Sequence, residues 1–150
     1  MVELLTVIAI IALLAGMLLP ALNRARQQAW ETTSRTMISS LEAALANYMS
    51  DYGDYPQDDG GTCESCVNLI TRVEDSDGKN NGRTYASFRS QDKDGSGNLK
   101  DPWARAYCYR YNTGTVQGSS YGLKFNIWSK GASTSVTTDD ITNWKTTKGQ

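Results

Sequence analysis

An acidic segment at residues 92–98 holds side chains well suited to binding a metal ion. Oxygen-bearing residues occupy every second position of this segment, namely Asp92, Asp94, Ser96 and Asn98. This alternation is that of the first half of an EF-hand calcium loop. The glutamate that completes such a loop is missing, because Trp103 stands where it is expected. Two interpretations therefore remain open, a calcium site and a solvated Asp/Gly turn.

Three cysteines, Cys63, Cys66 and Cys108, allow one disulfide bridge and one spare thiol. A bridge from Cys63 or Cys66 to Cys108 would stabilise the fold by roughly 4 kcal/mol in the chain-entropy model, whereas a Cys63–Cys66 bridge would constrain little. The sequence contains no histidine, the commonest general base and a frequent zinc ligand. It also lacks a nucleophile elbow and a Gly-rich phosphate loop. These absences argue against an enzyme.

A single carboxylate precedes a long apolar run at the start of the chain. After Glu3, residues 4–22 carry no charge and only Thr6 as a polar side chain. A helix needs about 20 such residues to cross a bilayer core. The run is longer than the apolar core of a signal peptide and follows an acid, so a retained segment is favoured. Gly16 and Pro20 interrupt it and predict either a simple kink or a stretch that unwinds when helices pack.

The helical pattern continues beyond the apolar run. Larger or apolar residues recur every three or four positions, at Trp30, Thr33, Met37, Leu41, Leu45, Tyr48 and Tyr52, and Ile38, Ala44 and Met49 widen this stripe. This spacing is typical of an amphipathic helix with one face toward a core. Gly53 and Pro56 should end the helix. We expect one helix over residues 2–52, whose first half must be buried in lipid or in other copies of the chain.

The C-terminal half contains two segments of alternating residues that predict antiparallel strands. One segment presents Tyr107, Tyr109 and Tyr111, and the other presents Tyr121, Leu123, Phe125 and Ile127. A third strand is expected at Asn143–Lys145. Both apolar faces should pack on the helix at Met37, Leu41, Leu45 and Tyr48, which gives an α+β fold.

This pattern divides the chain into three parts. Residues 1–22 form the transmembrane or filament-core half of the helix, residues 23–52 its amphipathic half, and residues 53–150 a globular head domain of loops and sheet. The net charge is −1 and no basic patch stands out, so the sequence contains no clear nucleic-acid site.

Several motifs resemble those of one family. Residues 2–22, VELLTVIAIIALLAGMLLPAL, closely resemble the N-terminal signature of type IV pilins and type II secretion pseudopilins. The helix end ALANYMSDYGDYP, the turn DPWARAY at 101–107, and FNIWSKG followed by DITNW also resemble pseudopilin motifs. Residues 57–100 match little. Ala104 and Ala106 replace the glycine and proline that are usual in the turn, so this turn is expected to differ.

The resemblance implies a pilin-like fold and a processing step. In that family a prepilin peptidase cuts just before the mature start and the new amine is methylated. By this resemblance the sequence begins about two residues inside the mature start, with Met1 where a Leu-like residue is expected. Either the sequence is truncated or its start is assigned wrongly, and the leader is expected upstream. Glu3 matches the glutamate of the family, and Gly16 and Pro20 match its helix-loosening positions.

Glu3 is expected to act in assembly, because a carboxylate in hydrocarbon is costly and needs a partner. In a filament of staggered helices, the terminal amine at Met1 of one copy can meet Glu3 of the next and fix the register. The alternative is that Glu3 lies at the wet edge of the membrane.

The resemblance also implies a second candidate calcium site. Major pseudopilins hold calcium in the loop that corresponds to residues 129–140, where this chain offers Ser129, Ser133, Asp139 and Asp140. Ser133 stands where an aspartate is expected. Calcium is therefore a possible ligand, and no other cofactor is expected.

The combined expectation is a structural filament subunit without enzymatic activity. It would reside in the bacterial inner membrane as a precursor and then assemble with copies of itself into a periplasmic or extracellular filament, a type IV pilus-like fibre or a type II secretion pseudopilus. Assembly machinery is implied by the resemblance. The alternative is a single-span membrane protein whose outer domain binds a ligand.

Overall fold

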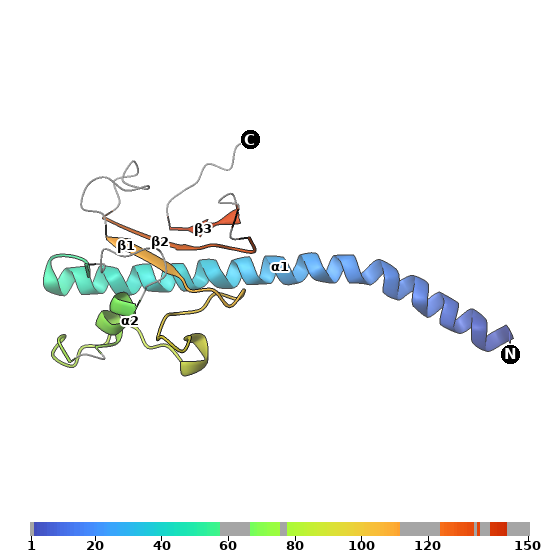
Figure 1. Cartoon of the computed structure of the whole chain (residues 1–150), viewed down its shortest axis with the longest axis horizontal. Helices are drawn as coiled ribbons and strands as arrows, with labels where there is room; N and C mark the ends of the chain where they lie inside the picture. Colours follow the sequence, from blue (N-terminus) through green and yellow to red (C-terminus); the bar gives the residue numbers. More distant parts are fainter. Residues whose placement is uncertain are drawn as a thin grey trace, which may run out of the picture. The chain divides into compact units, whose positions relative to one another are not determined.

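The computed structural model describes residues 2–57, 67–75, 78–111, 124–133, 135 and 139–143. The elements run in the order α1 (Val2–Tyr52), α2 (Val67–Glu74), η1 (Ser90–Asp92), β1 (Cys108–Tyr111), β2 (Phe125–Ser129) and β3 (Ile141–Thr142). Figure 1 shows the long helix α1 together with the small sheet. The predicted α+β, pilin-like fold is confirmed.

The chain forms two compact units. The first contains residues Met1–Thr32 and the second Thr33–Gln150. The helix α1 is continuous through the boundary between them. The first unit contains the first part of α1. The second unit contains the rest of α1, the sheet, α2 and the loops.

The sheet is antiparallel, with strand order β1-β2-β3. Tyr109 pairs with Ile127 and Tyr111 pairs with Phe125, so the apolar residues of β1 and β2 share one face. The third strand lies at Ile141–Thr142 and ends before Asn143, the first residue of the expected strand; Trp144 and Lys145 lie outside the described residues.

Asn143 ends this strand because its side chain takes over the pairing with β2. Its Oδ1 accepts a hydrogen bond from the backbone N–H of Ile127 over 2.9 Å, and its own N–H donates to the Ile127 carbonyl over 3.0 Å.

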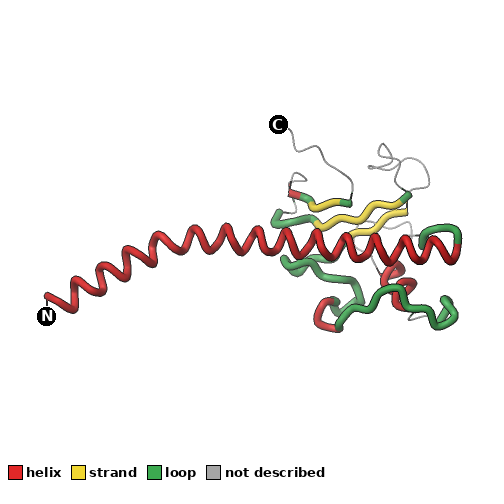
Figure 2. The backbone as a smooth tube through the Cα atoms, turned by 180° about the vertical axis from the view of Figure 1, so that it is seen from behind, coloured by secondary structure: helices red, strands yellow, loops and turns green. Residues whose placement is uncertain are grey.

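The outer half of α1 lies between two layers of the second unit. The sheet covers one side of the helix, and the segment with α2 covers the other (Figure 2). Fully or nearly fully buried residues of the helix are Ser34, Ile38, Leu41, Ala44 and Leu45. These five residues are named the α1 stripe. They share one hydrophobic core with Tyr109, Phe125, Ile127 and Ile141, apart from Ser34, which lines it.

The buried face of α1 agrees in part with the expected stripe. Ile38 and Ala44, which widen that stripe, are buried, and Ser34 is buried as well. Met37 and Tyr48 are only half-buried, and Thr33, Met49 and Tyr52 are exposed. The expected residues Leu41 and Leu45 are fully buried.

The helix α2 was absent from the sequence-based expectation. Leu69, Ile70 and Val73 are all buried in the core. Their spacing places them on one face of a two-turn helix. Tyr121, Leu123 and Trp144, which also belong to the expected strands, lie outside the described residues.

Candidate functional site

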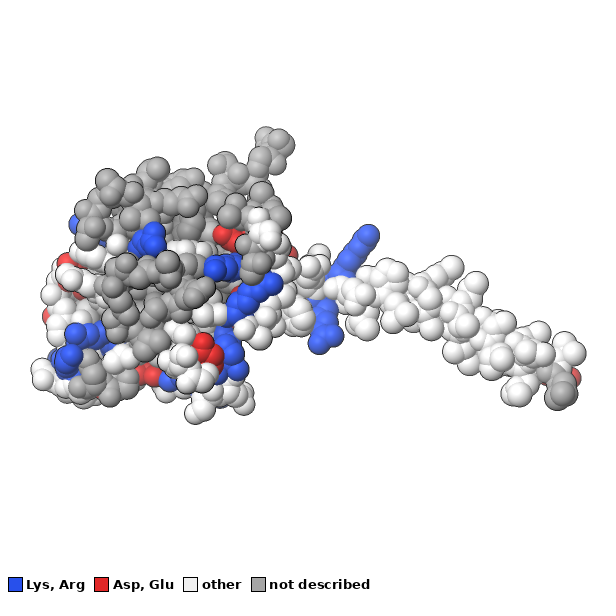
Figure 3. Space-filling model, in the orientation of Figure 1, with Lys and Arg blue, Asp and Glu red and all other residues white. Residues whose placement is uncertain are grey.

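The apolar half of α1 presents its side chains to the surroundings. The large hydrophobic residues between Val2 and Leu22 are 52–74% exposed in the single chain. Figure 3 shows a largely uncharged surface along this stretch, with a red patch at its N-terminal end, and most of the charged side chains lie over the second unit. Among the described residues, α1 is the one helix long and apolar enough to cross a membrane. An uncovered apolar surface of this extent requires lipid or another protein surface around it.

Glu3 lies in the first turn of α1. The hydroxyl of Thr6 donates to the Glu3 carbonyl oxygen over 2.8 Å, so the Thr6 side chain bonds within the same turn. A carboxylate near a helix N-terminus is favoured by the helix dipole. Met1 lies outside the described residues, so the pairing of its amine with Glu3 stays a prediction.

Gly16 and Pro20 lie within unbroken helix in the single chain. A Cβ atom added to Gly16 would meet nothing within 4 Å. The chain itself therefore gives no steric reason for glycine at this position. Any such reason must come from packing between chains or from unwinding. The unwound stretch was predicted for the packed filament, and it remains a prediction.

The first acidic loop is closed by its own hydrogen bonds. Asp94 Oδ1 accepts from the backbone N–H groups of Ser96 (2.9 Å) and Asn98 (2.8 Å), and Asp94 Oδ2 accepts from the Asn98 amide (3.0 Å). The Asn98 amide is the main reason that the pKa of Asp94 is lowered. Asp92 pairs with Arg89 at 3.2 Å. These contacts favour a self-closed turn over a calcium site, because the oxygens of Asp94 already have donors.

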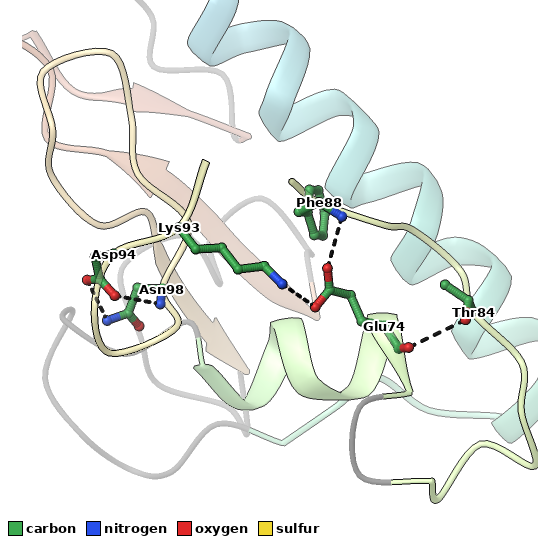
Figure 4. A network of polar contacts seen from close by, with 6 residues as sticks. All are labelled: Glu74, Thr84, Phe88, Lys93, Asp94 and Asn98. Carbon is green, nitrogen blue, oxygen red and sulfur yellow. Dashed lines mark hydrogen bonds and ion pairs between the residues drawn. The ribbon is translucent and has the colours of Figure 1, made fainter. Parts of the chain in front are cut away.

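A polar network fixes this loop to α2. Lys93 Nζ lies 2.5 Å from Glu74 Oε2, and Phe88 N–H donates to Glu74 Oε1 over 2.9 Å. Thr84 donates to the Glu74 carbonyl (Figure 4). Both charged side chains are mostly buried, at 23% and 15% exposure. This cluster holds three segments together, so its role is structural. The sequence analysis did not identify it.

The second candidate loop, residues 129–140, is held by a turn that precedes β1. In that turn, Asp101 is 4% exposed. Its Oδ1 accepts from Trp103 N–H over 3.0 Å and from Arg105 N–H over 2.8 Å, and its Oδ2 accepts from the Ser129 hydroxyl over 2.6 Å. The turn thus connects the start of the sheet to the end of β2.

Ala104 keeps this turn tight with a left-handed backbone. Its φ is +62°, and its N–H donates to the Asp101 carbonyl over 2.9 Å. Such a φ strains any residue with a Cβ atom and favours glycine. The alanine that replaces the usual glycine therefore carries strain.

The candidate calcium ligands in the second loop lie in different surroundings. Asp139 Oδ2 accepts from Ser133 N–H over 2.7 Å, while Asp139 Oδ1 is buried and has no donor among the described residues. Burial, and then the charge of Asp139, raise the pKa of Asp140. The Ser129 hydroxyl is already bonded to Asp101.

The part of the chain that the structure describes does not fit an ordinary calcium site. Calcium takes six to eight oxygen ligands. No group of three or more Asp, Glu, His or Cys side chains that could hold a metal comes together among the described residues. The loop carbonyls of Gly131 and Ala132 accept hydrogen bonds from the guanidinium of Arg105, at 2.6 and 2.9 Å.

Ion pairs and tyrosines fix the end of α1. Asp51 accepts from Arg83 at 2.6 Å and from Tyr85 at 2.7 Å, and Tyr85 is the larger cause of the lowered pKa of Asp51. Asp54 accepts from Tyr111 at 2.8 Å, which likewise lowers its pKa. These groups are at the surface, so they orient the end of α1 and contribute little to the free energy of unfolding.

Cys108 is buried in β1 and disulfide-bonded. Cys63 and Cys66 lie outside the described residues. Which of them pairs with Cys108 stays a prediction, to be read from peptide mapping without reduction.

Comparison with known proteins gives one family. The family model described as type II secretion system (T2SS), protein G, matches residues 21–144. The match covers the amphipathic half of α1, α2 and the sheet. It begins at residue 21, at the very end of the apolar run, so it is almost independent of that run. No curated protein and no solved structure matches the chain.

Proposed function

Because this chain belongs to the type II secretion system protein G family, we propose that it is the repeating structural subunit of a pseudopilus. In this proposal many copies stack through the apolar halves of α1 into a helical filament. The chain performs no reaction. Before assembly it resides in the inner membrane, where a prepilin peptidase and the assembly machinery act on it, and its terminal amine is methylated.

The exposed apolar surface of α1 carries this proposal. A protein that only crosses the membrane once needs an apolar helix in contact with lipid, and any uncharged apolar helix meets that need. A carboxylate in the first turn adds a cost that a filament can recover, because Glu3 of one copy then pairs with the terminal amine of another. This pairing also sets the register between neighbouring copies.

The experiment compares Glu3→Ala with Thr6→Ala in cells that overproduce the protein. Both variants remove a polar side chain from the first turns of α1 and keep the helix apolar. We expect both to insert into the membrane. Glu3→Ala should lose filaments visible by electron microscopy of sheared cells, and Thr6→Ala should keep them.

Wild-type filament yield from Glu3→Ala would overturn the pairing role. Wild-type protein that stays monomeric in membranes under conditions where its secretion machinery is present would instead favour the single-span, ligand-binding alternative.

A further inference from the structure

Two hydrogen bonds to Asp101 fix the backbone of Arg105. Its N–H donates to Asp101 Oδ1 over 2.8 Å, and its carbonyl accepts from Asp101 N–H over 2.7 Å. Asp101 is itself buried and bonded to Ser129. The starting point of the arginine side chain is therefore set by the turn.

The guanidinium spans two consecutive carbonyls of the β2–β3 loop. Nη1 donates to the Gly131 oxygen over 2.6 Å and Nη2 donates to the Ala132 oxygen over 2.9 Å. Arginine is always charged, and its planar fork suits two adjacent acceptors. Backbone carbonyls are also the ligands that loops offer to calcium. A second cation at the same oxygens would be repelled by the guanidinium.

The two ends of the loop also touch directly. Gly131 has φ +60°, and a Cβ atom added to it would lie 2.3 Å from the Asp139 carbonyl oxygen. The Gly131 N–H donates to Ser129 Oγ over 3.2 Å, and Ser133 N–H donates to Asp139 Oδ2 over 2.7 Å. Contacts within the chain therefore already close this loop.

We propose that Arg105 is the resident cation of the β2–β3 loop, which holds its shape without a metal ion. The guanidinium occupies the carbonyl oxygens of Gly131 and Ala132 and brings its positive charge to this side of the loop. In this chain, an arginine from the turn before β1 does the work that a calcium ion would do in the same loop. The proposal concerns the head domain and does not depend on filament assembly.

The buried Oδ1 of Asp139 is the observation that most favours a metal, because it has no donor among the described residues. The experiment is designed to decide between the two cations. Amide hydrogen exchange is measured at Gly131 and Ser133 in the full chain in detergent, with excess calcium and with a chelator. The same exchange is measured in Arg105→Gln, Arg105→Lys and the control Arg89→Gln, whose guanidinium pairs only with Asp92 among the described residues.

We expect wild-type exchange to be the same with calcium and with chelator. Arg105→Gln should exchange roughly tenfold faster or more at both amides, because a charge-assisted pair of hydrogen bonds is lost. Arg105→Lys should fall in between, since a point charge cannot bridge both carbonyls. Arg89→Gln should match the wild type.

Two results would overturn the proposal. One is a wild-type loop that calcium protects roughly tenfold or more against exchange relative to the chelated protein. The other is an Arg105→Gln chain whose Gly131 and Ser133 amides exchange as slowly as in the wild type. The calcium arm uses no variant, so it remains decisive if Arg105→Gln fails to fold.

Discussion

The hydroxyl of Ser129 donates a 2.6 Å hydrogen bond to Oδ2 of Asp101, and both residues are buried. Ser129 ends β2, and Asp101 begins the turn before β1. One buried carboxylate thus connects two segments that are distant in sequence. Its other oxygen accepts from two backbone N–H groups of its own turn.

Asp101→Ala should destabilise the second unit by about 3 kcal/mol, because three donors lose their acceptor in a buried site. Ser129→Ala should cost about 1–2 kcal/mol, since Trp103 and Arg105 keep their acceptor on Asp101 and only the longer 3.2 Å bond from the Gly131 N–H is lost besides the hydroxyl. Chemical denaturation followed by tryptophan fluorescence measures both. Equal losses from the two variants would mean that the turn does not depend on the carboxylate.

Ala104→Gly should stabilise the protein by about 1 kcal/mol, because it relieves the left-handed φ of +62°. The control is Ala106→Gly, in a residue that forms an extended bridge with Lys100. That change should destabilise by about 0.5–1 kcal/mol through chain entropy. The shift of the unfolding midpoint measures both stability changes, which should have opposite signs. A loss of stability in Ala104→Gly would show that Ala104 is not strained.

Leu45→Asp should cost several kcal/mol, because Leu45 is fully buried and an aspartate there would have no partner. Ala46→Asp is the matched control, since Ala46 is the next residue and is exposed. Limited proteolysis of the full chain should cut the sheet region of Leu45→Asp quickly and leave Ala46→Asp resistant. A resistant Leu45→Asp chain would contradict the packing of the sheet on α1.

Stability should fall as the pH rises from about 10 toward 12. Burial is the main cause that raises the pKa of Tyr107 to about 12, from an ordinary value of 10.0. A raised tyrosine pKa means that the folded state prefers the neutral phenol. Its stabilisation is complete below the unfolded pKa and is lost as the pH approaches the folded one.

Tyr107→Phe tests this pH dependence. The phenylalanine chain should lose less stability between these pH values than the wild type, as measured by urea unfolding at each pH. Tyr85 also has a pKa raised to about 12, mainly by burial, but solvent screening reduces its effect. If the free energy of unfolding of Tyr107→Phe falls with pH as steeply as that of the wild type, Tyr107 does not cause the alkaline loss of stability.

Gly16→Ala should stabilise the isolated helix by about 1 kcal/mol, because alanine is the better helix former and a Cβ atom meets nothing there. If the stretch to Pro20 unwinds in a filament, the same change should lower filament yield. Helix content by circular dichroism and filament yield by microscopy are measured on the same variant. Undiminished filaments with a more stable helix would contradict the unwinding.

The periodicity of the sequence was enough to predict α1, β1 and β2, because apolar residues recur there at helical or alternating spacing. It missed α2, whose two turns provide only Leu69, Ile70 and Val73 as buried residues. It also missed Ile141 and Thr142, which form β3 just before the expected strand, and the bond that the Asn143 side chain makes to β2. Short elements such as these are stabilised mainly by tertiary contacts, and the local sequence pattern does not reveal those contacts.

The candidate site was harder to predict for a different reason. Acidic residues are visible in a sequence, so the loops at 92–98 and 129–140 attracted attention as metal sites. Arg105 was missed because its partners are backbone carbonyls of Gly131 and Ala132, and a carbonyl has no residue signature. The donors to Asp94 were hidden for the same reason, since two of them are backbone N–H groups, and calcium binding at 92–98 stays a prediction.

The order of the sheet has a consequence for how the molecule is made. Neighbouring strands of the sheet are also neighbours along the chain, but the core joins Leu41 and Leu45 to Ile141, which comes much later in the sequence. A ribosome that builds the chain from its N-terminus completes the α1 stripe long before β3. Core residues of α2, such as Leu69, are made in between, and Ile141 is the last of the described core residues to be added. The core of the second unit can therefore close only after β3 has been made, and the part of the stripe that awaits this strand stays open to aggregation until then.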